Sequence, residues 1–263
     1  MTIDIYSVIS LLLIQLAGND PIGTATGFLW RDVVSSQYYL VTNYHVLSGK
    51  DPATGKVEDS KGRIPTSIRV FHNSSKLGEW KHIDYSVIDQ DGKPKWLGHP
   101  RFGSNVDVVL LAIDLPPGVT GYAINDQKWV DLQLRPAENI SIIGFPYGET
   151  AGGLFGIWQT GYIASEPELD FSGLPALLVD SKAWPGNSGS PVVARRYGSW
   201  SRKDGSQGFG SGDSFVTDFI GIYSGRLGKA EMKFVWKRSV IEEIPPFLNS
   251  CLKSWNQLSY MVL

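Results

Sequence analysis

Cysteine is almost absent from the chain, which has only Cys251 among its 263 residues. A single cysteine excludes a disulfide within the chain, and no cluster of cysteine and histidine has the spacing of metal ligands. Cys251 lies in an apolar segment near the C-terminus, which is typical of a small buried side chain. We therefore expect neither a structural metal nor another cofactor.

The sequence also has little that would direct it to a membrane or to a nucleic acid. The apolar stretch Val8–Leu16 is too short to span a bilayer, and no lysine or arginine precedes it as in a secretory signal. We interpret it as the first β-strand and expect a cytoplasmic protein, with a secreted one carrying an unrecognised signal as the alternative. A formal net charge of −2 gives no reason to expect a nucleic acid or an anionic membrane as partner.

What the chain has in quantity is short apolar runs separated by turn residues. Glycine (29 residues) and proline (15) are plentiful, whereas apolar residues at helical spacing are scarce. Six strands are predicted in each half of the chain: Leu11–Leu16, Thr26–Arg31, Tyr38–Thr42, Ser67–Phe71, Tyr85–Ile88 and Val106–Asp114, then Ile140–Phe145, Trp158–Ser165, Leu174–Asp180, Ser190–Ala194, Phe215–Ser224 and Lys233–Lys237. We predict an all-β protein of two six-stranded antiparallel β-barrels, with an N-terminal lobe over residues 1–120 and a C-terminal lobe over residues 121–263.

Other segments are predicted to lie outside the strands. Residues 198–214 are rich in glycine and serine with few apolar residues, which predicts a disordered or mobile flap. Ser239 followed by Glu242 fits a capping box and predicts a helix. A second helical segment is predicted to begin at Pro246, so the chain ends in a short helical region.

The stretch Trp184–Val193 contains Ser188 in a glycine-flanked turn. Glycine has no Cβ, so the backbone there can turn sharply and approach a ligand closely. Successive backbone N–H groups in such a turn can form a pocket for a negative oxygen beside the serine hydroxyl. An ordinary turn between two strands is the alternative, because glycine, asparagine and serine favour turns.

A serine hydroxyl is a weak nucleophile that needs a base, and the base needs an orienting group. Of the four histidines, only His45 follows an apolar strand, whereas His72 and His82 lie in polar contexts that predict loops and His99 lies in a turn. Asp107 lies near the start of an apolar run, where a buried carboxylate needs a partner such as an imidazole N–H. A core histidine and a solvent-facing aspartate are the alternatives.

Four segments resemble the trypsin-like serine peptidases, and most closely the disulfide-free bacterial glutamyl endopeptidases and high-temperature-requirement proteases. These segments are Gly23–Phe28, Val41–Val46, Asp107–Leu111 and Gly186–Pro191. The order of histidine, aspartate and serine along the chain is that of the chymotrypsin-type fold. The resemblance extends over roughly residues 8–245.

The resemblance implies a double β-barrel with His45 and Asp107 from the first barrel and Ser188 from the second meeting in the cleft between them. His45 would accept the Ser188 proton and pass it to the leaving amine, while Asp107 would orient the imidazole. The backbone N–H groups of Gly186 and Ser188 would form the oxyanion hole, with Asn187 between them.

The resemblance also implies substrate-binding residues. Ser224 and Gly225 resemble the segment that pairs with an extended substrate, which would bind as an added β-strand. Lys182 occupies the family's position at the floor of the primary specificity pocket, and Arg226 lies just past the pairing segment. Two cations there favour an acidic side chain before the scissile bond. The alternative is that the side chain of Lys182 or of Arg226 turns outward or pairs with an acidic neighbour.

Asn187 stands where pancreatic-type members have an aspartate that receives a newly cut N-terminus. A neutral amide cannot form that ion pair, so zymogen activation of that kind is not expected. The sequence therefore predicts a serine endopeptidase acting on a protein or peptide substrate. Because its activity would not be held back by a zymogen form, a regulatory protein partner is expected to restrain it. A catalytically silent module of the same fold, which binds peptides or a partner protein, is the alternative.

Overall fold

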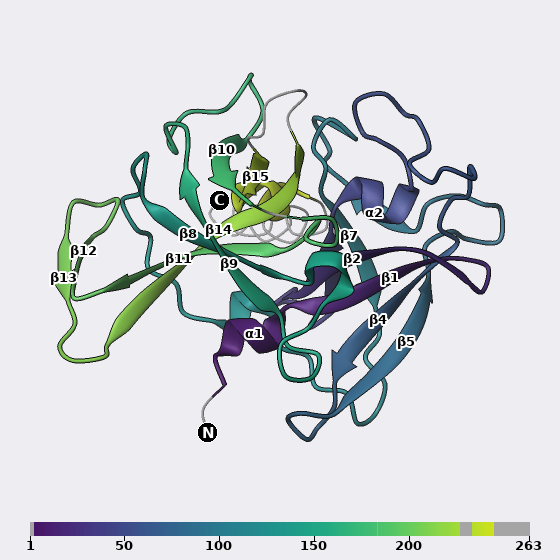
Figure 1. The fold of residues 1–263 in the computed structure, drawn as a ribbon, viewed down its shortest axis with the longest axis horizontal. Coiled ribbons are helices and arrows are strands. Elements are labelled where there is room, and N and C mark those ends of the chain that lie inside the picture. Colours follow the sequence, from purple (N-terminus) through teal and green to yellow (C-terminus); the bar gives the residue numbers. More distant parts are fainter. Residues whose placement is uncertain (1–2, 183, 227–232, 245–263) are drawn as a thin grey trace, which may run out of the picture.

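The computed structural model describes residues 3–182, 184–226 and 233–244, which form two β-rich lobes side by side (Figure 1). The predicted helical segment beginning at Pro246 and the predicted burial of Cys251 lie outside the described residues. None of the helices in the described ranges has the length and apolar character needed to cross a bilayer.

The first lobe is built on a seven-stranded antiparallel sheet in the order β5-β4-β1-β2-β3-β7-β6. Its strands are β1 (Leu11–Ala17), β2 (Asp20–Arg31), β3 (Tyr38–Thr42), β4 (Ser67–Asn73), β5 (Trp80–Ser86), β6 (Trp96–Gly98) and β7 (Val109–Ile113). The sequence predicts six strands here, and the additional one is the three-residue β6, which pairs with β7. So short a strand has no run of apolar residues by which it could be recognised.

The second lobe contains the predicted six-stranded antiparallel barrel, which closes in the order β10-β15-β14-β11-β8-β9. Its strands are β8 (Asn139–Gly144), β9 (Ile157–Ile163), β10 (Ala176–Ser181), β11 (Pro191–Tyr197), β14 (Phe215–Arg226) and β15 (Lys233–Lys237). The all-β double-barrel prediction is thus confirmed. The lobe boundary at residues 120 and 121 stays a prediction.

The described helices are short: α1 (Ile5–Ile9), α2 (Tyr44–Ser48), α3 (Ser239–Glu243) and the 3₁₀ turns η1 (Ile124–Asp126) and η2 (Pro146–Gly148). The prediction that Val8 and Ile9 begin a strand is wrong, because the Asp4 carboxylate accepts a hydrogen bond from the Tyr6 N–H and starts α1.

The prediction of a capping box at the start of α3 is wrong as well. Arg238, not Ser239, is the N-cap residue, and it has helical dihedral angles and no side-chain capping bond. Its N–H donates to Ile220 O, which ties the start of α3 to β14. The helix therefore begins from the end of β15 without a cap.

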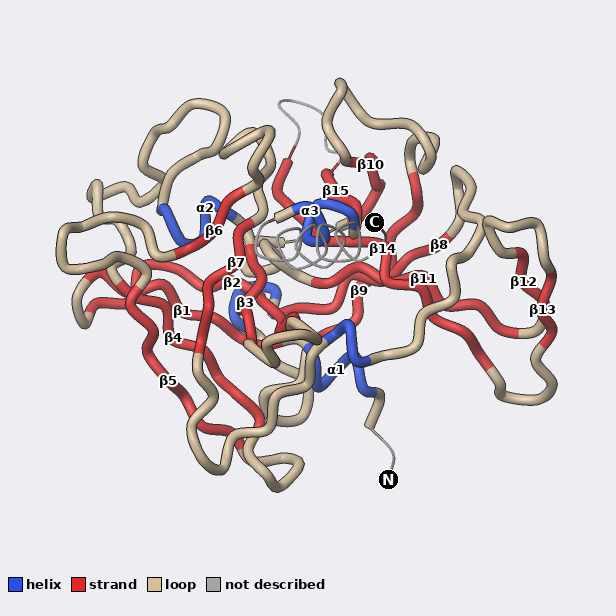
Figure 2. The backbone as a smooth tube through the Cα atoms, turned by 180° about the vertical axis from the view of Figure 1, so that it is seen from behind, coloured by secondary structure: helices blue, strands red, loops and turns tan. Residues whose placement is uncertain are grey.

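The prediction of a disordered or mobile flap over residues 198–214 is also wrong. β12 (Ser199–Ser201) and β13 (Gln207–Phe209) form a two-stranded hairpin that projects from the second lobe in both views (Figures 1 and 2). Lys203 N–H donates to Asp131 O, and Gln133 N–H donates to Ser201 O, so the hairpin is bound to the segment that leads into β8. Glycine and serine composition predicted flexibility, but cross-strand pairing orders the segment.

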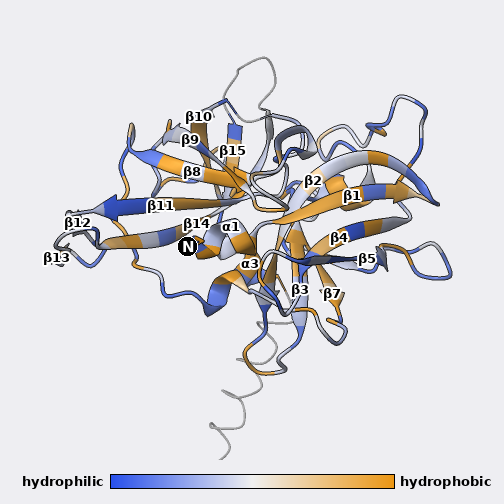
Figure 3. Cartoon of the chain, turned by 60° about the horizontal axis from the view of Figure 1, so that its bottom comes forward, coloured by the Kyte–Doolittle hydropathy of each residue, from blue (hydrophilic) through white to orange (hydrophobic). Residues whose placement is uncertain are grey.

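Three apolar cores hold the fold together. One lies in the first lobe around Leu13, Leu40 and Leu111, and another inside the closed barrel around Ile142 and Val192. The third joins the lobes, since it contains residues of both, with Phe28 of β2 in edge-to-face contact with Phe219 of β14 at 5.6 Å between ring centroids. Hydrophobic residues accordingly follow the central strands, while many outer loops are hydrophilic (Figure 3).

Candidate active site

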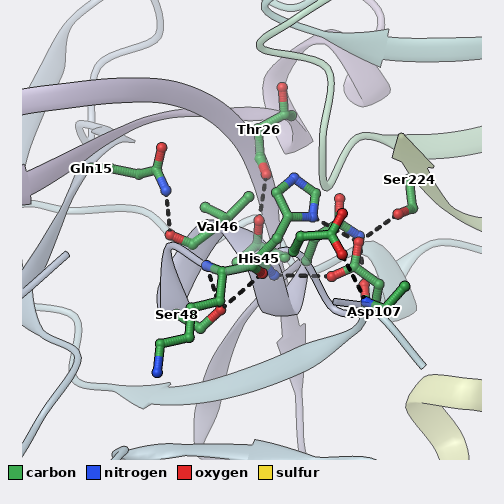
Figure 4. Close-up of polar contacts among 12 residues, drawn as sticks. Gln15, Thr26, His45, Val46, Ser48, Asp107 and Ser224 are labelled. Carbon is green, nitrogen blue, oxygen red and sulfur yellow. Dashed lines mark hydrogen bonds and ion pairs between the residues drawn. The ribbon is translucent and has the colours of Figure 1, made fainter. Parts of the chain in front are cut away.

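Asp107 and His45 lie in direct contact at the edge of the first lobe. His45 is in α2, immediately after β3, and Asp107 precedes β7, the neighbour of β3 in the sheet. His45 Nδ1 lies 2.7 Å from Asp107 Oδ2, and the His45 backbone N–H donates to Asp107 Oδ1 at 2.9 Å (Figure 4). Because a carboxylate only accepts, Nδ1 carries the ring proton and Nε2 is left as the basic nitrogen.

Asp107 is buried, at 3% exposure, yet its charge is compensated by several donors. In addition to His45, the Ser224 hydroxyl donates to Asp107 Oδ2 at 2.5 Å (Figure 4). The Asn43 side-chain amide donates to the Asp107 backbone carbonyl at 2.7 Å and fixes the aspartate main chain. The predicted imidazole partner of the buried carboxylate is therefore present, and the His45 backbone N–H and the Ser224 hydroxyl donate to the carboxylate as well.

The environment of His45 raises the pKa of the imidazole above its ordinary 6.5. Burial of the ring opposes protonation, but attraction to the Asp107 carboxylate and the hydrogen bond to it outweigh burial, with smaller contributions from Glu58 and Asp51. The His45 side chain keeps 14% exposure, so part of the ring can be reached from solvent.

The turn that carries Ser188 has a defined pattern of backbone hydrogen bonds. Asn187 N–H donates to Trp184 O, and the Pro185 carbonyl accepts from Tyr147 N–H of η2 at 2.6 Å. In a trans peptide the N–H points opposite to the carbonyl, so the Gly186 N–H points away from Tyr147. Within the described residues, the N–H groups of Gly186 and Ser188 have no hydrogen-bond acceptor.

These two free N–H groups are the ones that sequence reasoning assigned to an oxyanion hole. The Asn187 N–H is engaged within the turn, so the backbone of Asn187 adds no third donor. Gly186 has φ +95°, and a Cβ there would collide with the carbonyl oxygen of Phe145, so only glycine suits this position.

Thr26 of β2 connects the turn to the first lobe. Its N–H donates to Ser188 O at 2.9 Å, and its hydroxyl donates to Gly186 O at 2.8 Å. The Thr26 carbonyl accepts from the Thr42 hydroxyl at 2.8 Å, three residues before His45 (Figure 4). These bonds place the serine turn beside the end of β3, from which the histidine follows.

The Ser188 turn reaches the Asp107 side of the site as well. Gly189 N–H donates to Tyr223 O, and the next residue along β14, Ser224, contacts Asp107. Between the described Ser188 hydroxyl and His45 no direct hydrogen bond is formed. In enzyme structures without substrate, catalytic hydrogen bonds are often long or poorly aligned and tighten only when the substrate binds.

The geometry is matched by a sequence comparison. Residues 25–200, more than half of the chain, match the family described as the trypsin-like peptidase domain. The chain belongs to this family. Membership supports a serine protease that acts on protein or peptide substrates. No curated protein sequence matches the chain significantly.

Solved structures similar to this trypsin-like chain include two forms of the protease Rv3671c from M. tuberculosis. The active form is 17% identical, and its alignment covers 90% of this chain and 78% of that chain with a TM-score of 0.41. The inactive serine-to-alanine mutant is 16% identical, and its alignment covers 90% of this chain and 84% of that chain with a TM-score of 0.43. A serine endoprotease from Yersinia pestis is 14% identical, with 90% of this chain and 61% of that chain covered and a TM-score of 0.46.

The predicted specificity residues of this trypsin-like chain are less closely assembled. Lys182 follows β10 and is exposed, and the side chain of Arg226, at the end of β14, lies outside the described residues. Gly225 lies where the register of β14 against β15 shifts, between Ser224 and Arg226. A lysine that sequence reasoning did not single out, Lys233 of β15, is buried and is the register partner of Arg226.

The other histidines of this trypsin-like chain are not part of the site. His72 and His82 were predicted to lie in loops, which is wrong, since they belong to β4 and β5. Burial lowers the pKa of His72 to about 4, so His72 is a neutral core residue. Its Nε2 forms a hydrogen bond with the Tyr85 hydroxyl. Among the described residues, no group of three or more His, Cys, Asp and Glu is placed to hold a metal ion.

Sequence reasoning missed the residues that hold the serine turn. Thr26 lies within Gly23–Phe28, one of the segments that resemble the family, but only the fold shows that it forms hydrogen bonds with both Gly186 and Ser188. Tyr147 has the left-handed dihedral φ +54°, and Gln159 is one polar residue in an ordinary strand. Their contacts connect residues 28 or more positions apart, so no local pattern points to them.

Proposed function

We propose that this protein is a serine endopeptidase that hydrolyses peptide bonds through an acyl-enzyme on Ser188. The observation that carries the proposal is the contact of the buried Asp107 carboxylate with His45 Nδ1 at 2.7 Å, which leaves Nε2 as a base. The free N–H groups of Gly186 and Ser188 give independent support. Together they supply a base, its orienting group and donors for an oxyanion.

In the proposed reaction, Ser188 Oγ attacks the carbonyl carbon of the scissile bond while its proton passes to His45 Nε2. The carbonyl oxygen becomes an oxyanion that accepts hydrogen bonds from Gly186 N–H and Ser188 N–H. His45 then gives the proton to the leaving nitrogen, the C–N bond breaks and Ser188 is acylated. His45 Nε2 then takes a proton from a water molecule whose oxygen attacks the acyl carbon; the bond between that carbon and Ser188 Oγ breaks, His45 returns the proton to Oγ, and the acid product is released.

Asp107 and its partners support the protonated state that His45 passes through. The imidazolium would lie 2.7 Å from a carboxylate that is shielded from water, where its charge is stabilised more strongly than in solution. The Ser224 hydroxyl donates to that carboxylate, and the Asn43 amide holds the Asp107 main chain through its backbone carbonyl, so both help to fix the group that orients the ring.

The test is peptide hydrolysis by wild-type protein and by Ser188→Ala. We expect Ser188→Ala to lose about 10⁶-fold in kcat while unfolding at nearly the wild-type temperature. Turnover by Ser188→Ala at the wild-type rate would remove Ser188 from the reaction.

A catalytically silent binding module is the second candidate, favoured by the absence of a direct bond between the described Ser188 hydroxyl and His45. The two candidates differ in covalent reactivity, since only an activated serine is acylated by a fluorophosphonate. Folded wild-type protein that is not labelled, and that still binds peptides, would favour the module.

For substrate preference we propose an acidic side chain before the scissile bond. Lys182 and Arg226 are the predicted cations, and the buried Lys233 pairs in register with Arg226 and with Val179, three residues before Lys182. A panel of peptides that differ only at that residue tests the preference. Equal or faster cleavage after basic residues would contradict it.

The regulatory partner and the cytoplasmic location remain proposals. A pull-down with Ser188→Ala as bait, and fractionation of the native cells, are the measurements that test them.

A further inference from the structure

Asn187 lies in sequence between Gly186 and Ser188, whose N–H groups form the proposed oxyanion hole, and it is completely buried. Its Nδ2 donates to Gln159 Oε1 of β9 at 2.5 Å. Among the described residues, this is the single hydrogen bond that the Asn187 side chain makes, since its Oδ1 has no partner. Gln159 is therefore the one side chain that holds Asn187 by a polar contact.

Two contacts of the serine turn come from the same hairpin. β8 and β9 pair over Asn139–Gly144 and Ile157–Tyr162. The loop that joins them carries Tyr147, whose N–H fixes the Pro185 carbonyl, and β9 carries Gln159. The orientation of the 185–186 peptide and that of Asn187 are thus both set by this hairpin.

We infer that Gln159 is a positioning residue, which through Asn187 keeps the N–H groups of Gly186 and Ser188 directed at the substrate oxyanion. The inference rests on the proposed peptidase function. It deepens that function because it names an internal contact that sets the oxyanion turn.

The energetic reason lies in the burial of Asn187. Without the Gln159 oxygen, the buried amide would have no acceptor, and an unsatisfied buried donor destabilises the conformation that holds it. A turn that rearranges to bring the amide to another acceptor or to water would avoid this cost. Because Asn187 lies between Gly186 and Ser188 in sequence, such a rearrangement would redirect their N–H groups.

Three substitutions on β9 separate positioning from a general structural effect. Gln159→Met keeps the length of the side chain and removes the accepting oxygen. Gln159→Glu keeps an acceptor in the same place, and the partial exposure of Gln159 tolerates the charge. Thr160→Val, at the exposed neighbouring position, is the matched control.

Each variant is measured for kcat and KM on a peptide substrate and for affinity towards a peptide aldehyde, whose adduct with Ser188 resembles the oxyanion intermediate. We expect Gln159→Met to lose about 10²-fold in kcat, the lower end of the effect of removing one oxyanion donor. Aldehyde affinity should fall in parallel, with little change in KM. Gln159→Glu should recover most of the loss, and Thr160→Val should match wild type.

Retention of wild-type kcat and aldehyde affinity by folded Gln159→Met would overturn the inference, and so would a loss that Gln159→Glu does not recover. Should Gln159→Met fail to fold, Asn187→Ser serves instead, because its shorter side chain does not reach Gln159. A similar loss of kcat supports the inference, and wild-type kcat contradicts it. Wild-type protein that neither cleaves peptides nor reacts with a fluorophosphonate refutes the proposed function, and this inference with it.

Discussion

The Ser224 hydroxyl donates a hydrogen bond of 2.5 Å to Asp107 Oδ2, the same carboxylate oxygen that lies 2.7 Å from His45 Nδ1. The resemblance stated from the sequence implies that Ser224 lies in a segment that pairs with substrate, and in the structure its side chain contacts Asp107 of the first lobe. The second barrel thus contributes to orienting the proposed base as well as supplying the proposed nucleophile. The two lobes are joined at the site by this bond.

Ser224→Ala should slow catalysis without unfolding the protein. Its hydroxyl satisfies a buried carboxylate, and loss of such a partner costs about 1–3 kcal/mol. A cost of this size at the reacting centre corresponds to a loss of about 10-fold or more in kcat/KM. The control is Ser181→Ala, since the buried Ser181 hydroxyl has no partner in the described structure and its removal should leave kcat/KM unchanged. Equal kcat/KM for both variants would contradict a role of Ser224 at Asp107.

Asp107→Asn should preserve the fold and lower kcat by about 10⁴-fold, the size of the effect known for this substitution in a chymotrypsin-type triad. An amide nitrogen facing His45 Nδ1 favours the opposite tautomer, in which Nε2 carries the proton and cannot act as a base. Asp114→Asn is the matched control, because Asp114 is exposed at the far end of β7. A kcat near wild type in Asp107→Asn would remove the carboxylate from the mechanism.

Activity should rise with pH along a single limb that reports His45. The neutral ring is the active form, and the net effect of Asp107 raises the His45 pKa above 6.5, so the midpoint of the limb in kcat/KM should lie above 6.5. In Asp107→Asn the residual limb should move to lower pH, because the attraction that stabilises the imidazolium is gone and burial remains. A wild-type midpoint below 6.5, or a limb that does not move in Asp107→Asn, would contradict this account of the base.

Gly186→Ala should lower kcat strongly, by about 10²- to 10³-fold, because the added Cβ would collide with the Phe145 carbonyl and displace one oxyanion donor. Gly205→Ala is a control for positive φ alone. Gly205 has φ +83° in the β12–β13 turn with open space around it, so its substitution should affect only stability, by about 1 kcal/mol. Gly186→Ala with wild-type kcat would show that its N–H is not an oxyanion donor.

Trp200→Ala should lower the melting temperature, since Trp200 packs against the core of the closed barrel and anchors the β12–β13 hairpin. We expect about 2 kcal/mol, less than for a fully buried tryptophan, which corresponds to roughly 4–8 °C. Phe209→Ala on the same hairpin is the control, because Phe209 is 77% exposed and its loss should have little effect. Equal melting temperatures would indicate that the hairpin does not pack in solution.

The contact between His45 and Asp107 could be predicted from sequence because each residue has a strong local context. Asp107 lies in an apolar run where a charge needs a partner, and His45 follows a β-branched strand. The contacts of Gln159 and Tyr147 could not be predicted, because they depend on how β8 and β9 approach a turn that comes later in the chain. The β12–β13 hairpin was missed because glycine and serine outnumber its apolar anchor, Trp200.

Mass spectrometry of the intact protein after reaction with a fluorophosphonate tests the central claim most directly. The account predicts one adduct on wild-type protein, located by peptide mapping to Ser188, and no adduct on Ser188→Ala or on folded His45→Ala. Labelling of His45→Ala at the wild-type rate, or an adduct on a serine other than Ser188, would contradict it.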